Sequence, residues 1–105
     1  MGSVRPYSRN AAAGPALLFV KAEWCPHCQH TKPEMRKAAA ILGSVLPVYS
    51  VDSDKNADVV RQLNVDGFPT IFFRTADGRL KTYRGERVGQ KIADWACAQS
   101  GMCGR

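Results

Sequence analysis

The chain has 105 residues, of which 45% are hydrophobic and 23% are charged, and its formal net charge is +6. This length predicts one domain with a single modest core. No apolar run is long enough to span a membrane, and the first fifteen residues lack the apolar stretch of a signal peptide, so we expect neither a transmembrane helix nor a signal peptide.

The first half of the chain predicts a strand, a long helix and a second strand. Residues 1–15 mix Pro, Ser, Arg, Asn and Gly, and we expect them to be mostly irregular with one short strand near residues 3–5. The apolar run at 16–22 predicts a buried strand, and the pattern over 29–42 predicts a helix. Residues 46–51 predict a second strand, parallel to the first because a helix lies between them.

The second half predicts a helix, a hairpin and a last helix. Residues 52–54 offer N-caps for a helix over 57–63. Residues 68–73 predict a third strand, which a turn joins to an antiparallel strand over 80–83. A final helix is expected over about residues 88–98. This order, β-α-β-α-β-β-α, predicts an α/β fold in which helices cover both faces of a mixed central sheet.

We expect an N-terminal segment over 1–15, a domain over 16–98 and a tail over 99–105. A basic patch can mark a nucleic-acid or other anionic partner. Here no aromatic side chains interleave with the basic ones and no nucleic-acid motif accompanies them, so we predict a solvated basic face and no nucleic-acid partner. The basic residues concerned are Arg74, Arg79, Lys81, Arg84, Arg87 and Lys91.

The most informative stretch is Trp24-Cys25-Pro26-His27-Cys28, between the first strand and the first helix. Two cysteines two residues apart at a helix start can close to a disulfide and reopen with little backbone movement. A thiolate there faces unpaired N–H groups and the positive end of the helix dipole, which favour the ionised form. The spacing in this setting predicts dithiol–disulfide chemistry. A structural disulfide or two inert thiols is the alternative.

The element order and this motif resemble the thioredoxin superfamily over about residues 16–98. Pro33 stands five residues after Cys28, where the family has a proline that kinks its helix. Residues 67–70, Gly-Phe-Pro-Thr, look like the family's cis-proline loop. Residues 83–87, Tyr-Arg-Gly-Glu-Arg, resemble the end of a catalytic protein disulfide isomerase domain.

The resemblance implies that Cys25 is the nucleophile and Cys28 the resolving thiol. Cys25 is nearer the helix start, and the family exposes its first cysteine, whereas the second lies one turn in and is more buried. Trp24 would shield the pair and bind substrate. A tryptophan that simply packs in the core is the alternative reading, and the two are compatible.

Pro26 and His27 are expected to tune the pair. A proline at the first helical position has no N–H to satisfy, and a protonated His27 favours a neighbouring thiolate. Favouring the thiolate stabilises the reduced form, so the disulfide becomes a better oxidant. The same Cys-Pro-His-Cys sequence occurs in bacterial periplasmic disulfide oxidases of this superfamily. A solvent-exposed His27 without a role is the alternative.

The resemblance also implies that Pro69 is cis and lies opposite the cysteines. The backbone of Phe68 would there pair with a substrate strand, as in β-augmentation. Most X-Pro bonds in folded proteins are trans, so composition alone does not predict this isomer.

The sequence departs from the family at a buried acid, usually six residues before the first cysteine, that accepts the proton of the second. Phe19 stands there, and Val48 replaces the acid's usual lysine partner, so no unpaired buried charge remains. Lys21, on the same strand face, is a candidate substitute for the charge or a lysine that reaches solvent. Arg87 matches the arginine that, in disulfide isomerase domains, favours ionisation of the second cysteine; a surface arginine is the alternative.

Cys97 and Cys103 are the remaining cysteines, and Gly101 between them allows a chain reversal. We expect a disulfide that ties down the tail, with two unpaired thiols as the alternative. The Cys-x-x-Cys pair with His27 and His30 also suggests zinc, but no second Cys-x-x-Cys or His-x-His accompanies it, so we expect no metal.

Taken with the resemblance, these residues predict a thiol–disulfide oxidoreductase that oxidises, reduces or isomerises protein disulfides through Cys25 and Cys28. A thioredoxin-like reductase and a redox-active adaptor without turnover are the alternatives. Expected partners are protein thiols or disulfides and a redox partner, either glutathione or a reductase or oxidase. We expect no cofactor, no membrane contact and a monomer, and an oxidising compartment would fit the motif.

Overall fold

The structure, a computed structural model, describes residues 2–8 and 13–103. Within these residues it contains five strands and three helices. The expected α/β fold with a mixed sheet and helices on both faces is confirmed. In chain order the elements are β1 (Val4–Pro6), β2 (Ala16–Lys21), α1 (Pro26–Leu42), β3 (Val48–Asp52), α2 (Ala57–Leu63), β4 (Thr70–Arg74), β5 (Leu80–Thr82) and α3 (Gly89–Ser100).

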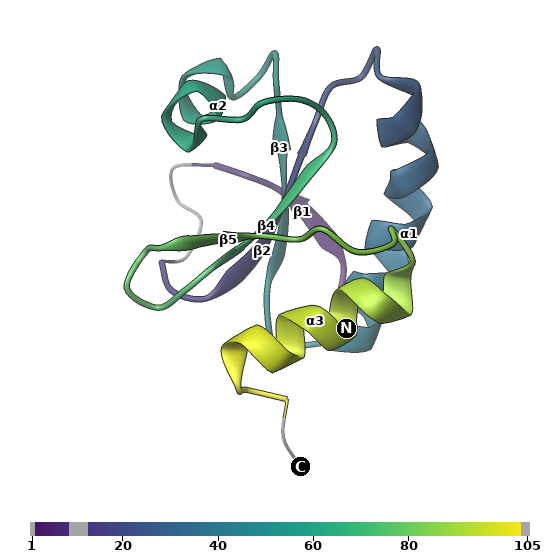
Figure 1. Cartoon of the computed structure of the whole chain (residues 1–105), viewed down its shortest axis with the longest axis vertical. Coiled ribbons are helices and arrows are strands. Elements are labelled where there is room, and N and C mark those ends of the chain that lie inside the picture. The colour runs from purple at the N-terminus through teal and green to yellow at the C-terminus, as the bar shows by residue number, and fades with distance from the viewer. Residues whose placement is uncertain (1, 9–12, 104–105) are drawn as a thin grey trace.

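The five strands form one sheet in the order β1-β3-β2-β4-β5. β1, β2 and β3 are parallel, whereas β4 is antiparallel to β2 and β5 is antiparallel to β4. Figure 1 shows α2 on one side of the sheet and α1 and α3 on the other. Side chains alternate along β2, so Leu17 and Phe19 join the core under α1 and α3, while Leu18 and Val20 join the core under α2.

Four connections of the chain meet at one edge of this sheet. β2 and β3 both end there, at Lys21 and Asp52, which are register partners. β4 begins at the same edge because it runs antiparallel to β2, and β5 ends there because it runs antiparallel to β4. The Cys-x-x-Cys motif after β2, the proline loop before β4 and residues 83–88 after β5 are therefore brought to the same edge.

Three elements begin at residues other than those predicted, each for a local reason. α1 begins at Pro26, three residues early, because the sulfur of Cys25 caps its first turn. β3 and β4 begin directly after Pro47 and Pro69, since proline has no N–H to donate to a sheet. α2 has the predicted bounds, but its N-cap residue is Asn56 rather than a residue of 52–54.

The N-terminus of α3 is held against α1 by one carboxylate and one glycine. Glu34 Oε1 accepts the backbone N–H of Gly89 at 2.8 Å, which satisfies a free N–H group of the first turn. A Cβ at Gly89 would lie 2.6 Å from Lys37 Cβ and 2.8 Å from the carbonyl oxygen of Glu34, so a larger residue would push the helices apart. This contact fixes where α3 begins and hence where residues 84–88 lie.

Cys97 and Cys103 form a disulfide, with their Cα atoms 5.1 Å apart. Gly101 follows α3 with φ 66° and ψ 14°, a left-handed conformation that reverses the chain. Both cysteines pack against the core cluster under α1 and α3. The tail is therefore attached to the domain through residue 103, and the N-terminal segment contributes β1. Residues 1, 9–12 and 104–105 of these two segments lie outside the described residues.

Replacing both Cys97 and Cys103 by alanine is expected to lower the free energy of unfolding by about 2 kcal/mol, because the unfolded chain regains the entropy of a short closed loop. The sequence separation of the bridge is 6, which places its effect at the small end of the range. Urea unfolding measures the loss. The same comparison in the presence of a reductant that opens the bridge in wild type is the control, in which the difference should disappear. Equal stability of wild type and the tail variant without reductant would contradict the expectation.

Candidate active site

Cys25 is the N-cap of α1 and Cys28 lies in its first turn. Both are free thiols. Cys25 has the extended conformation of a cap residue, and its sulfur accepts the backbone N–H of Cys28 at 3.3 Å. As a thiol, Cys25 donates to the carbonyl oxygen of Phe68 at 3.7 Å. A sulfur that caps a helix lies where the unpaired N–H groups and the helix dipole favour negative charge.

The pKa values of the two thiols are shifted in opposite directions. The hydrogen bond from the Cys28 side chain lowers the pKa of Cys25, and the backbone N–H groups of Cys28 and His27 add to this against the opposing effect of burial. Burial raises the pKa of Cys28 to about 11, and its interaction with Cys25 acts in the same direction. The first cysteine is therefore the one that ionises, and the second holds its proton.

Cys25 is less exposed than the resemblance implied. Its exposed fraction is 5%, against 0% for Cys28, because Phe68 packs against both. Trp24 is 68% exposed, so it does not pack in the core. Its ring meets that of Phe68 edge-on, with 5.8 Å between centroids. An exposed aromatic surface therefore lies next to the largely buried Cys25.

The Phe68–Pro69 peptide bond is cis, as the resemblance implied. Pro69 is buried, and Phe68 is partly buried next to the cysteines. The carbonyl of Phe68 faces Cys25, whereas the ladder of β4 starts at Thr70. The loop therefore presents backbone to the reacting sulfur.

Pro26 and His27 occupy the first turn of α1, and both are exposed. The backbone N–H of His27 is one of the groups that lower the pKa of Cys25. The carbonyl oxygen of His27 accepts the hydroxyl of Thr31 at 2.8 Å, inside the helix. A role for the imidazole stays a prediction, since it needs the ring to be protonated near the thiolate.

Replacing His27 by alanine is expected to make the Cys25–Cys28 pair more reducing, because a protonated ring that favours the thiolate is lost. A change of one unit in the pKa of Cys25 corresponds to about 30 mV. Redox titration against glutathione buffers measures the potential. His30→Ala removes an exposed histidine one turn further along α1 and is the control. If the two variants had equal reduction potentials, His27 would have no specific effect on the potential of the Cys25–Cys28 pair.

Arg87 is exposed and lies in the connection between β5 and α3. Its charge acts on Cys25, whose pKa it helps to lower after the larger effect of the hydrogen bond from Cys28. The expected effect on the second cysteine stays a prediction. The connection that carries Arg87 is tied to α1, because the N–H of Gly89, two residues later, is bonded to Glu34.

Phe19 is 1% exposed and packs in the core under α1 and α3, so no carboxylate occupies the usual position beneath Cys28. The nearest charge on that strand face is Lys21. Burial opposes its charged form, but hydrogen bonds to Glu23 and Asp52 outweigh burial, and the pKa of Lys21 is raised. The charge of Lys21 in turn lowers the pKa of Cys28, against the larger effect of burial.

Lys21 belongs to a chain of four charges that ends on α1. Its Nζ lies 3.1 Å from Asp52 Oδ2 and also contacts Glu23, and Glu23 Oε1 lies 3.1 Å from Lys32 Nζ. Gln29 Nε2 donates to the carbonyl oxygen of Glu23 at 2.7 Å. These contacts tie the segment before Cys25 to β3 and to α1.

Asp52 is the site residue that sequence analysis missed. Its exposed fraction is 7%, and Oδ1 accepts the backbone N–H groups of Asp54 and Lys55 at 2.8 and 3.1 Å. Burial opposes ionisation, but these bonds and Lys21 outweigh it, so the pKa of Asp52 is lowered. Its position in the sequence could have indicated this contact. Lys21 and Asp52 each end an apolar strand, and the ends of neighbouring parallel strands lie side by side.

No group of three or more His, Cys, Asp or Glu residues that would hold a metal ion occurs in residues 2–8 and 13–103. None of the helices in this described part is long and apolar enough to cross a membrane.

One edge of the five-stranded sheet carries the Cys-x-x-Cys motif, the helix capped by Cys25 and the proline loop that faces its sulfur. The family model described as thioredoxin matches residues 8–98. The chain belongs to the thioredoxin family. The thioredoxin domain is 40% identical over 93 residues to protein disulfide-isomerase A6 of Homo sapiens and 43% identical over 93 residues to the Mesocricetus auratus protein of that name.

These alignments cover 86% of the chain but 21% of each isomerase, so the chain spans about a fifth of the curated relatives it matches. A solved structure, the J-Trx1 fragment of ERdj5, superimposes with a TM-score of 0.83 over 91% of this chain and 51% of that one. Human ERp44 superimposes with a TM-score of 0.80 over 94% of this chain and 30% of that one. At 17% and 22% identity these two show the fold alone.

Proposed function

We propose that this thioredoxin domain is a thiol–disulfide oxidoreductase of protein substrates, with Cys25 as the nucleophile and Cys28 as the resolving thiol. The observation that carries the proposal is the unequal placement of the two sulfurs: Cys25 caps the first turn of α1 and accepts an N–H at 3.3 Å, whereas Cys28 is 0% exposed. The pKa is accordingly lowered at Cys25 and raised to about 11 at Cys28. A structural pair has no need of such an asymmetry, whereas exchange needs one sulfur to attack first.

The first step is attack by the Cys25 thiolate on a sulfur of the substrate disulfide. The substrate S–S bond breaks, a Cys25–substrate disulfide forms, and the leaving substrate thiolate takes a proton from solvent. The hydrogen bonds from the first turn of α1 hold the attacking charge before the reaction. Trp24 and Phe68 offer the apolar surface on which the substrate rests.

The second step is attack by the Cys28 thiolate on the Cys25 sulfur. The Cys25–Cys28 disulfide forms, the mixed disulfide breaks, and two electrons have passed to the substrate, which leaves as a dithiol. Cys28 must lose its proton first. Lys21 assists by favouring the thiolate, not as a base, because a charged lysine has no free acceptor. In the reverse direction the same steps oxidise a substrate dithiol.

The compartment and partners follow from the same chemistry. An oxidising compartment fits the Cys97–Cys103 disulfide and the similarity to disulfide isomerases. The substrates are proteins with accessible disulfides or thiols, and a glutathione pool or a dithiol protein returns the pair to its starting state.

Turnover separates this enzyme from a redox-active adaptor. With a dithiol reductant in excess, wild type is expected to reduce insulin disulfides faster than the reductant alone, and the Cys25→Ser/Cys28→Ser variant to add nothing. Catalysis that survives in the double variant would place the activity elsewhere. If insulin were reduced no faster with wild type than with the reductant alone, the domain would be a binding module without catalytic activity.

A further inference from the structure

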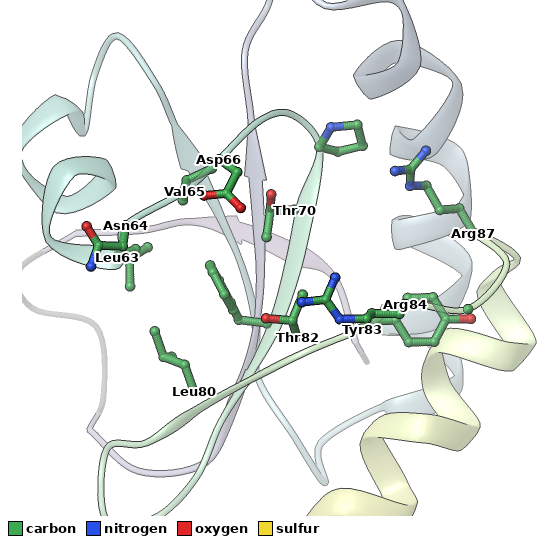
Figure 2. Close-up of a pocket in the computed structure, with 13 residues that line it drawn as sticks. Leu63, Asn64, Val65, Asp66, Thr70, Leu80, Thr82, Tyr83, Arg84 and Arg87 are labelled. Atoms are coloured by element: carbon green, nitrogen blue, oxygen red, sulfur yellow. The ribbon is translucent and has the colours of Figure 1, made fainter.

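A groove adjoins the active site on the α2 side of the sheet. Its volume is about 560 Å³, and it reaches the cysteines through Pro69, which lines it. Phe72 and Leu80 contribute apolar surface, and Leu80 is 37% exposed although it is large and apolar. Figure 2 shows Asp66 along one side of this groove and Arg84 on the side of β5. The groove therefore combines an apolar surface with charged groups at its sides.

The two arginines that line the groove have no carboxylate partner among the described residues. Arg84 and Arg87 both line it and both are exposed. Within residues 2–8 and 13–103, neither guanidinium lies within ion-pair distance of a carboxylate, whereas Arg79 pairs with Asp77 at 3.2 Å and Lys91 pairs with Glu86. Asp66 is the carboxylate that lines the opposite side. A ligand carboxylate is therefore favoured on the arginine side of the groove and disfavoured beside Asp66.

The groove lies within reach of a chain attached to Cys25. Arg87 is close enough for its charge to act on Cys25, and the carbonyl of Phe68, next to Pro69, lies 3.7 Å from the same sulfur. An extended chain advances about 3.3 Å per residue. Arg84 and Pro69 line the same groove, so an extended chain that is bonded to Cys25 and passes Pro69 reaches Arg84 within a few residues.

We propose that this groove is a substrate-specificity subsite, which binds an extended segment of the substrate polypeptide whose Asp or Glu, two or three residues from the reacting cysteine, pairs with Arg84. Phe72 and Leu80 take an apolar neighbour of that residue. A polypeptide fits better than a free anion because the groove offers both apolar surface and a guanidinium next to the reacting cysteine. A guanidinium can bind a carboxylate with two hydrogen bonds. The inference rests on the proposed function, since it needs a substrate held at Cys25.

Matched peptide disulfides test the proposal. Three peptides differ only at the residue two positions from the cysteine, which is Glu, Gln or Lys, and kcat/KM is measured for each with wild type, Arg84→Gln and Arg79→Gln. Wild type is expected to favour the Glu peptide over the Gln peptide roughly threefold to tenfold at low salt, as for a partly desolvated charged hydrogen bond, and the Lys peptide least. Arg84→Gln should bring the Glu peptide down to the value of the Gln peptide.

Arg79→Gln removes an exposed arginine of the β4–β5 turn outside the groove, so it should keep the preference. Equal rates of wild type on the Glu and Gln peptides, or a preference that survives in Arg84→Gln, would overturn the subsite. Oxidised glutathione also carries carboxylates and is the competing ligand. If Arg84→Gln lost activity toward oxidised glutathione but not toward the Glu peptide, the groove would be a glutathione site and not a polypeptide subsite. Turnover of the Gln peptide by wild type reports the proposed function separately, since its absence would remove the function and the subsite together.

Discussion

A Cys28→Ser variant is expected to accumulate covalent complexes with its substrates. Cys25 keeps its cap position and its lowered pKa in part, because the backbone N–H groups of residue 28 and of His27 remain. The first attack therefore still occurs, but no second thiol lies beside the mixed disulfide to release it. Release should slow by at least about a hundredfold, since it then depends on an external thiol.

Non-reducing mass spectrometry measures the trapped species, whose mass is the sum of the reduced protein and the substrate that carries the disulfide. Cys25→Ser, with the other cysteine intact, is the matched control and should trap nothing, because the Cys28 thiol is fully buried and holds its proton. If Cys25→Ser trapped substrate at a rate similar to that of Cys28→Ser, the assignment of Cys25 as the nucleophile and Cys28 as the resolving thiol would be wrong.

Release of the mixed disulfide in wild type is expected to rise about tenfold per pH unit through the neutral range, because the attacking species is the Cys28 thiolate. Burial is the main reason that the pKa of Cys28 lies near 11, and this cause does not depend on the charge of Cys25. The part that comes from the Cys25 charge is lost in the mixed disulfide. The sign is fixed: a raised pKa leaves a protonated thiol at neutral pH, so higher pH speeds release until the pKa is passed.

Lys21 is expected to set part of that rate. In Lys21→Met/Asp52→Asn, which removes the ion pair without leaving a buried charge alone, release should slow several-fold at neutral pH while the first attack by Cys25 changes little. Single-turnover rates across pH distinguish the two steps. Lys55→Met, an exposed lysine near the same strand end, is the control. Release rates equal to wild type in the double variant would show that the charge of Lys21 does not assist ionisation of Cys28.

The arrangement of the site was predictable where it depends on local pattern. The bounds predicted for the helix over 57–63 are those of α2, and the strand–motif–helix order placed Cys25 and Cys28 at a helix start. The small exposure of Cys25 was not predictable, since it results from Phe68, which comes from a loop forty-three residues later in the chain. Contacts of that kind depend on sheet register, which no local pattern specifies.

The charged groups illustrate the same limit. Lys21 was placed on the correct strand face, but its partner Asp52 was taken as a helix cap, because pairing across parallel strands requires the register of β2 and β3. The resemblance assigned Arg87 to the second cysteine, and an effect of its charge on Cys25 was not predicted, because that effect depends on where the connection between β5 and α3 lies. The cluster of basic residues was visible in the sequence, but not which of them line the groove.

The asymmetry of the two thiols is the central claim, and limited alkylation tests it most directly. The reduced protein is treated with less than one equivalent of iodoacetamide at a series of pH values, and the adducts are mapped by peptide mass spectrometry. The account predicts that Cys25 takes the label, with a midpoint below that of an ordinary cysteine, while Cys28 stays unlabelled until strongly alkaline pH. Labelling of Cys28 first, or of both cysteines with the same midpoint, would contradict it.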